Sequence, residues 1–169
     1  MPPLFCIAGY KDVGKTTLTV RLVREMTERG FKVSTIKHAH HAVDIDQPGR
    51  DSYLHREAGA QEVVLVSRAR WALIHELRGV DEPPLAEIID RLGPCDIVLT
   101  EGYKRDKHPK IEVRRNGVDR PPLAEDDPSV VAIACDVAIG DAPVPVLDMD
   151  DISGIVDFIL SHVGLEKTQ

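Results

Sequence analysis

Aromatic residues and cysteine are scarce in this chain of 169 residues, and its 21 Lys and Arg are outnumbered by 28 Asp and Glu. Only 4% of the residues are Phe, Trp or Tyr, and the formal net charge is −7. Nucleic-acid-binding domains usually carry a basic face and aromatic stacking platforms, so this composition argues against that class. No apolar run approaches the roughly 18 residues of a membrane span, and no cationic stretch followed by an apolar one opens the chain. We therefore expect a cytoplasmic protein with no nucleic-acid or membrane partner.

The three cysteines, Cys6, Cys95 and Cys135, are too few and too far apart for a disulfide framework. Each stands in an apolar, strand-like run, which predicts buried and reduced thiols. A chain of this length buries roughly 70% of its unfolded surface on folding, so it needs no disulfide for stability. The sequence shows no repeat, low-complexity tract or linker, and we expect residues 1–169 to form one domain.

Short apolar runs alternate with amphipathic runs along the chain. Near-continuous apolar strands are typical of a parallel sheet that is covered on both faces. We expect residues 63–67 and 72–75 to form a hairpin, and Asn116-Gly117 to form a second hairpin turn after 110–115. Strands are expected at 3–8, 31–37, 63–67, 72–75, 96–100, 110–115, 130–134 and 144–147, and helices at 15–29, 48–59, 84–92 and 151–163.

The segment from Gly9 to Thr16 fits G-x-x-x-x-G-K-[ST], the phosphate-binding P-loop, at every fixed position. The glycines let backbone N–H groups turn toward phosphate oxygens, and the helix starting near Lys15 adds its N-terminal dipole. Lys15 would reach the β- and γ-phosphates, and the Thr16 hydroxyl would bind Mg²⁺. We therefore expect a single nucleotide-binding domain with the three-layer α/β fold of P-loop NTPases, a mostly parallel central sheet and β-hairpin insertions. The loop contacts expected at the phosphates also include Gly9, Asp12, Val13 and Gly14.

Polar residues follow the strands predicted at 31–37 and 96–100. Ligands of open α/β sheets lie at the carboxyl ends of the strands, where Glu101 could hold Mg²⁺ through water or orient an attacking water. Lys37 and His38 open a polar segment that continues through His40 and His41. Phosphate or substrate contact and transition-metal binding are both open for these residues.

Asp136 follows the strand predicted at 130–134, where base-reading loops lie in GTPases. Its carboxylate could pair with the N1 and N2 donors of guanine, which adenine lacks. The usual guanine motif, Asn-Lys-x-Asp, is absent, because Asn116 is the only asparagine of the chain. Asp136 is thus a candidate base reader, with a purely structural role as the alternative.

The order of these motifs resembles that of the molybdopterin-guanine dinucleotide biosynthesis protein B family over nearly the whole chain. Besides the P-loop, the resemblance rests on Ile36-Lys37-His38-x-His40-His41, Asp44 to Asp46, Pro48 to Tyr53, Ala58 to Ala60, Arg70 to Leu73, Glu101 to Lys104 and Ala134 to Asp136. It implies a homodimeric GTP-binding protein of weak GTPase activity. Such a protein assists the guanylyltransferase that joins GMP to molybdopterin, and molybdopterin itself is a further candidate ligand.

By position, the resemblance implies that Gly14, Lys15, Thr16 and Thr17 bind phosphate and that Glu101 serves the Mg²⁺ region. Lys15 and Glu101 are the expected catalytic pair, with GTP and Mg²⁺ as the ligands. The family usually has Ser and Gly where this chain has Lys11 and Asp12, and losing a glycine narrows the allowed backbone angles.

Other functions fit the same residues. A GTPase metallochaperone would use the cluster of His38, His40 and His41. An ATP-dependent small-molecule kinase would turn over at about 1–100 s⁻¹, against about 10⁻⁴ to 10⁻² s⁻¹ for unassisted GTPases. An adaptor that holds nucleotide without using it is a third alternative.

Overall fold

The computed structural model describes residues 1–39, 44–117, 120–137 and 139–166, and the chain forms two compact units. The first unit contains residues 1–38 and 89–169, and the second contains residues 39–88. Within the described parts of the chain, no helix is long and apolar enough to cross a membrane. The expectation of one folding domain over 1–169 stays a prediction.

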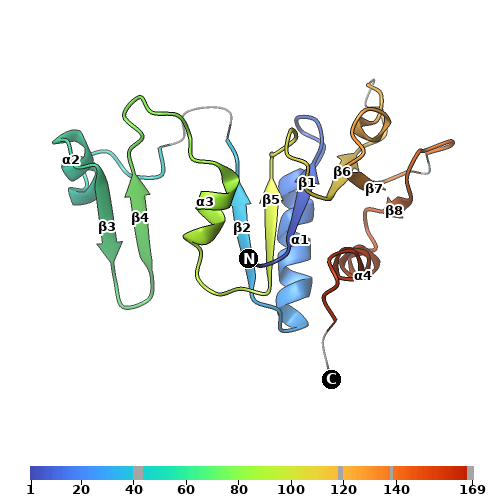
Figure 1. The fold of residues 1–169 in the computed structure, drawn as a ribbon, viewed down its shortest axis with the longest axis horizontal. Helices are drawn as coiled ribbons and strands as arrows, with labels where there is room; N and C mark the ends of the chain where they lie inside the picture. Colours follow the sequence, from blue (N-terminus) through green and yellow to red (C-terminus); the bar gives the residue numbers. More distant parts are fainter. Residues whose placement is uncertain (40–43, 118–119, 138, 167–169) are drawn as a thin grey trace. The chain divides into compact units, whose positions relative to one another are not determined.

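Six parallel strands form the sheet of the first unit, in the order β2-β5-β1-β6-β7-β8 (Figure 1). All residues of β1, β5 and β6 are buried, as expected for parallel strands covered on both faces. The predicted α/β fold with a mostly parallel central sheet is therefore confirmed. The strands are β1 (Leu4–Ala8), β2 (Val33–Lys37), β5 (Ile97–Glu101), β6 (Lys110–Arg114), β7 (Val130–Cys135) and β8 (Val146–Asp148).

Two helices bury their apolar faces in the core of this unit. Helix α1 (Lys15–Glu28) contacts β1, β2 and β5, and helix α4 (Ile152–His162) contacts both α1 and β8. The Asp151 carboxylate caps α4 by accepting the backbone N–H of Gly154 at 2.9 Å. A short 3₁₀ helix, η1 (Leu123–Glu125), precedes β7. The helical residues of the core are Leu18, Leu22 and Met26 from α1 and Ile155, Val156, Ile159 and Leu160 from α4.

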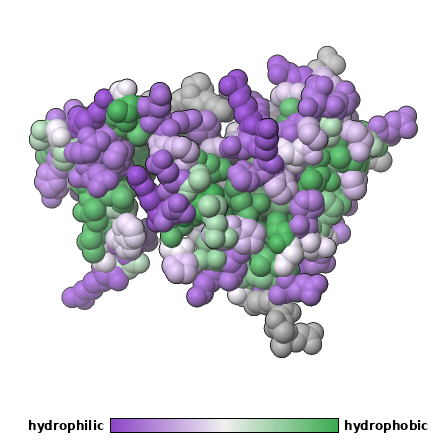
Figure 2. Space-filling view, viewed as in Figure 1, coloured by the Kyte–Doolittle hydropathy of each residue, from purple (hydrophilic) through white to green (hydrophobic). Residues whose placement is uncertain are grey.

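The second unit consists of α2 (Asp51–Glu57) and an antiparallel hairpin of β3 (Glu62–Val66) and β4 (Trp71–His75). This hairpin was predicted, and its turn is closed by the backbone N–H of Ser67, which donates to the carbonyl of Arg70 at 2.9 Å. Helix α3 (Leu85–Asp90) leads the chain back into the first unit. Apolar side chains gather on the hairpin surface (Figure 2), and those exposed there are Val64, Leu65, Val66, Trp71 and Leu73.

Asn116-Gly117 forms a turn, but the hairpin predicted there is wrong. Strand β6 ends at Arg114 and pairs in parallel with β1 on one side and β7 on the other. An Asn-Gly pair favours a tight turn locally, but the neighbours of a strand are set by packing across the whole sheet.

The cysteines follow the sequence expectation at two of three positions. Cys6 and Cys135 are buried within β1 and β7, and all three thiols are free. Cys95 instead lies before β5 and is only half-buried, so the predicted burial of its thiol is wrong.

Candidate nucleotide-binding site

The P-loop joins the end of β1 to the start of α1. Gly9 has φ +143°, and a Cβ there would stand 2.6 Å from the Val113 carbonyl oxygen of β6. Only a residue without a side chain therefore fits between the loop and this strand. At the other end, Gly14 is the N-cap of α1 in the left-handed conformation, and the first turn of α1 contains no acidic residue. The loop thus leads into a helix N-terminus suited to an anion.

Asp12 occupies a position at which the resembled family usually has glycine. It adopts φ +63°, in the left-handed region. Aspartate enters this region more readily than most residues, because its short polar side chain can bond locally. The substitution therefore does not prevent the backbone turn that the loop needs.

Lys15 folds over the loop. Its Nζ donates to the Tyr10 carbonyl oxygen at 2.5 Å. Burial lowers the pKa of Lys15, the positive charge of Lys104 acts in the same direction, and the carboxylates of Glu101 and Asp12 oppose this. A bound phosphate would place a negative charge beside Lys15 and Lys104. This charge would favour the protonated form of Lys15.

The second half of the site joins α1 to the ends of β2 and β5. The Thr16 hydroxyl donates to Glu101 Oε1 at 2.8 Å. Lys37 Nζ lies 3.3 Å from the same Glu101 oxygen and 3.4 Å from Thr16 Oγ1. One ammonium group thus lies beside two side-chain oxygens. Oxygen atoms are also the ligands that Mg²⁺ prefers. The Lys37 ammonium is the cation beside these two oxygens, and the oxygen chemistry of Thr16 and Glu101 is compatible with the predicted Mg²⁺ ligands.

These groups line one cavity of about 430 Å³. Of the expected contacts, Val13 has its side chain in the core, at 3% exposure, so only its backbone can face a ligand. His38 lies at the end of β2 with its ring 4.9 Å from that of Tyr103. The lining residues are Lys11, Asp12, Gly14, Lys15, Thr16, Thr17, Lys37 and Glu101.

The predicted histidine cluster is only partly visible, because His40 and His41 lie outside the described residues. Across the described ranges, no group of three or more His, Cys, Asp or Glu side chains could hold a metal ion. The polar residues that follow in the sequence belong to the second unit, where Arg56 pairs with Asp44, Asp46 and Glu76.

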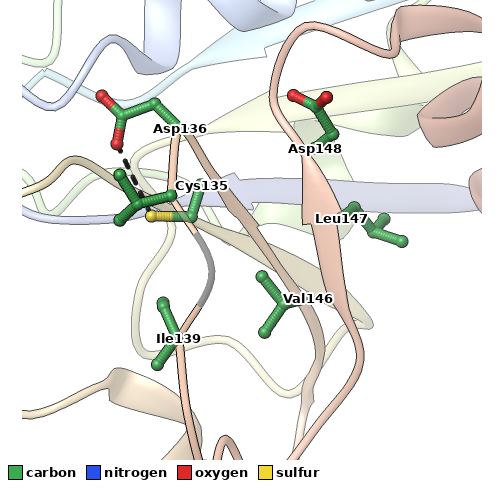
Figure 3. A pocket seen from close by; sticks show the side chains of 7 residues that line it. Cys135, Asp136, Ile139, Val146, Leu147 and Asp148 are labelled. Atoms are coloured by element: carbon green, nitrogen blue, oxygen red, sulfur yellow. Dashed lines mark hydrogen bonds between the residues drawn. The ribbon is translucent and has the colours of Figure 1, made fainter.

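Asp136 follows β7 and lines a second cavity of about 350 Å³ (Figure 3). Its Oδ1 accepts the backbone N–H of Asn116 at 2.9 Å, and its Oδ2 lies 3.4 Å from Arg115 Nη1. The hydrogen bond from Asn116 lowers the pKa of Asp136 despite some desolvation. The Asp136 carboxylate is therefore ionised at neutral pH and bound to the segment that follows β6.

Two residues near these cavities were missed by the sequence analysis. Arg115 places its Nη2 3.4 Å from the point where a Gly14 Cβ would stand, so it lies against the P-loop. Asp148, the last residue of β8, lines the same cavity as Asp136. The sequence could have indicated Asp148. It comes at the end of an apolar strand, which is the same pattern that made Asp136 a candidate.

Known proteins resemble this chain over most of its length. The family model described as molybdopterin guanine dinucleotide synthesis protein B matches residues 4–136. The molybdopterin-guanine dinucleotide biosynthesis adapter protein of Escherichia coli (strain K12) is 37% identical over 163 residues, which cover 95% of this chain and 93% of the relative. The protein of the same name from Haemophilus influenzae is 39% identical over 158 residues, which cover 93% of this chain and 87% of the relative.

Solved structures resemble the whole chain. A crystal structure of molybdopterin-guanine biosynthesis protein B has a TM-score of 0.75 at 28% identity, with 95% of this chain and 99% of that chain covered. The crystal structure of Bacillus subtilis MobB has a TM-score of 0.73 at 25% identity, with 95% of this chain and 98% of that chain covered.

Proposed function

The chain belongs to the molybdopterin guanine dinucleotide synthesis protein B family, and we propose that it is a GTP-binding adapter in the synthesis of that dinucleotide. It binds GTP with Mg²⁺ at the P-loop, hydrolyses it slowly and assists a molybdopterin guanylyltransferase. The observation that carries the proposal is the cavity in which the P-loop, the Thr16–Glu101 pair and Lys37 meet.

The P-loop backbone and four side chains of this cavity have separate roles in the proposal. The backbone from Gly9 to Gly14 surrounds the phosphates, and Lys15 exchanges the Tyr10 carbonyl for a phosphate oxygen. Thr16 and Glu101 would hold Mg²⁺, and the ion would supply positive charge to the phosphates. Lys37, whose ammonium lies 3.3 Å from Glu101 Oε1, would add a positive charge to the same cavity for the phosphates.

We expect slow hydrolysis from the set of residues that line the P-loop cavity. Fast GTPases orient water with glutamine and stabilise the transition-state charge with arginine. Neither residue type is among the described residues that line the P-loop cavity. We expect turnover of about 10⁻⁴ to 10⁻² s⁻¹, the range of unassisted GTPases.

We also propose that the protein is a homodimer. The β3–β4 hairpin is our candidate for the contact between the two subunits. Trp71 and Val66 oppose each other in the hairpin register and are 67% and 72% exposed. Contiguous apolar surface of this kind is unusual on a monomer and typical of an interface. Trp71→Ser should shift the protein toward monomer in sedimentation equilibrium, and an unchanged mass would exclude this contact.

The test of the nucleotide proposal is equilibrium binding of GTP, GDP and ATP with Mg²⁺, together with steady-state hydrolysis. Lys15→Ala should remove most GTP affinity, because it deletes the charge directed at the phosphates. Lys107→Ala is the matched control, since it removes an exposed lysine that does not line the P-loop cavity. Unchanged GTP binding in Lys15→Ala would refute the P-loop assignment. A preference for ATP with fast turnover would instead favour a small-molecule kinase.

A further inference from the structure

A second cavity lies between the chain segments that end β7 and form β8 (Figure 3). We propose that this cavity holds the guanine base of the nucleotide and that Asp148, rather than Asp136, reads it. The proposal rests on the proposed GTP binding and assigns the base specificity of that site.

The cavity lies next to the P-loop. Arg115 joins the two places, because Nη2 lies 3.4 Å from the point where a Gly14 Cβ would stand and Nη1 lies 3.4 Å from Asp136 Oδ2. One guanidinium group therefore separates the phosphate cradle from the wall of the cavity. A nucleotide has one sugar between its α-phosphate and its base, so it can bridge this separation with Arg115 beside the sugar and the α-phosphate.

The end of β8 is also tied to the P-loop helix. Arg21 of α1 donates to the Met149 carbonyl at 3.3 Å and pairs with Asp150 Oδ1 at 2.9 Å. The turn that directly follows Asp148 is therefore bonded to α1, the helix that begins at the P-loop. This fixes the distance between base reader and phosphate site, as recognition of a nucleotide requires.

The lining of the cavity suits a purine. Its volume of about 350 Å³ falls at the lower end of small-molecule sites, which run from about 300 to 1,000 Å³. Apolar side chains offer surface for the faces of a flat base, while carboxylates from two parallel strands stand at one side (Figure 3). The apolar residues of the lining are Cys135, Val137, Ile139, Val146 and Leu147, of which Leu147 turns its side chain away from Ile139 and Val146 and packs against the core (Figure 3).

A carboxylate at this point selects guanine over adenine. Guanine presents N1–H and N2–H donors side by side, and both can bond to the two oxygens of one carboxylate. Adenine presents an acceptor at N1, which would face the negative charge with no proton between them. Loss of such a paired contact costs a factor of about 10 to 100 in affinity.

The two carboxylates differ in what they already bind. Asp136 uses both oxygens within the protein, one for the Asn116 N–H and the other for Arg115. Asp148 uses only Oδ1, which accepts the Asp150 N–H at 2.9 Å. Its Oδ2 has no hydrogen-bond partner within the described part of the chain. The Asp150 contact orients the Asp148 carboxylate and leaves it able to accept from a base.

The deciding experiment compares the Kd of GTP, XTP and ATP for Asp148→Asn, Asp136→Asn and Asp141→Asn. Xanthine carries an oxygen in place of the guanine amino group, so an amide side chain complements it better than a carboxylate does. We expect Asp148→Asn to weaken GTP by about 10- to 100-fold and to bind XTP more tightly than the wild type does. Asp136→Asn should leave the ratio of GTP to XTP affinity unchanged. Asp141→Asn is the matched control, because it makes the same change in the β7–β8 connection outside the cavity lining.

An unchanged GTP-to-XTP ratio in Asp148→Asn would overturn the inference, as would a switch to XTP in Asp136→Asn. Circular dichroism of each variant checks that the exposed Asp-to-Asn changes leave the fold intact. Failure of the proposed function would give a different result. The wild type would then not bind GTP, or Lys15→Ala would not weaken the binding.

Discussion

The close approach of the P-loop to β6 can be tested with Gly9→Ala. Gly9 has φ +143°, and an added Cβ would meet the Val113 carbonyl oxygen at 2.6 Å and Val13 Cγ2 at 3.1 Å. Ordinary contacts between carbon and carbonyl oxygen are about 3.3–3.6 Å, so the new atom would be too close by about 0.7 Å or more. The Val113 oxygen belongs to a buried strand backbone, which cannot turn aside as a flexible side chain can.

Three contributions should therefore change the free energy of unfolding, two lowering it and one raising it. An alanine held at this φ costs about 1–3 kcal/mol in backbone strain. Displacing a packed strand costs a further 1–3 kcal/mol, roughly as in overpacked cores. The smaller conformational freedom of alanine in the unfolded chain returns about 0.4–1 kcal/mol. We expect a net loss of about 1–6 kcal/mol, a large fraction of the usual stability of about 5–15 kcal/mol.

Urea unfolding monitored by circular dichroism would measure this loss. Gly117→Ala is the control, because Gly117 belongs to the same unit and has φ +84°, but an added Cβ there meets nothing within 4 Å. The control carries the strain without the steric clash and should lose at least about 1 kcal/mol less than Gly9→Ala. Equal losses in the two variants would refute the close approach of the P-loop to β6.

Three further outcomes are expected. Glu101→Gln should retain GTP binding, while the Mg²⁺ concentration for half-maximal effect rises about 10-fold in titrations, because a neutral amide replaces the carboxylate bonded to Thr16. Lys110→Met should lower the free energy of unfolding by about 3 kcal/mol in urea titrations, because the fully buried Lys110 bonds to Asp127 at 2.9 Å and two carbonyls. Burial acts to raise the pKa of Asp127, but hydrogen bonds from Ser129 and Lys110 outweigh it and lower that pKa below its ordinary value of 3.8. Asp127 thus contributes stability above pH 3.8 that is lost as the pH falls through its folded pKa, and Asp127→Asn should show a shallower acid limb in unfolding measured from pH 5 to pH 2. A Mg²⁺ dependence, unfolding curve or acid limb identical to that of the wild type would contradict the respective expectation.

The segment from β1 through the P-loop to α1 could be predicted because its signals are local. An apolar run, the glycine spacing and a period of 3.6 residues in α1 all lie within residues 4–28. The β3–β4 hairpin was predictable for the same reason, since its two strands are joined by a four-residue turn. The second predicted hairpin failed because β6 has neighbours that are distant in sequence, at β1 and β7. A turn signal alone cannot show that two other strands already occupy both edges of the strand that precedes it.

The two aspartates of the second cavity show the same limit at the level of a site. Each ends an apolar strand, so a local pattern nominates both Asp136 and Asp148 equally. Their difference arises from contacts that need the order of the strands, because β6 beside β7 places Arg115 and the Asn116 N–H against Asp136. Since those donors come from 20 and 21 residues away, no local window contains them. The sequence can thus propose that a carboxylate reads the base, whereas the choice of Asp148 follows from which carboxylate the sheet leaves able to accept.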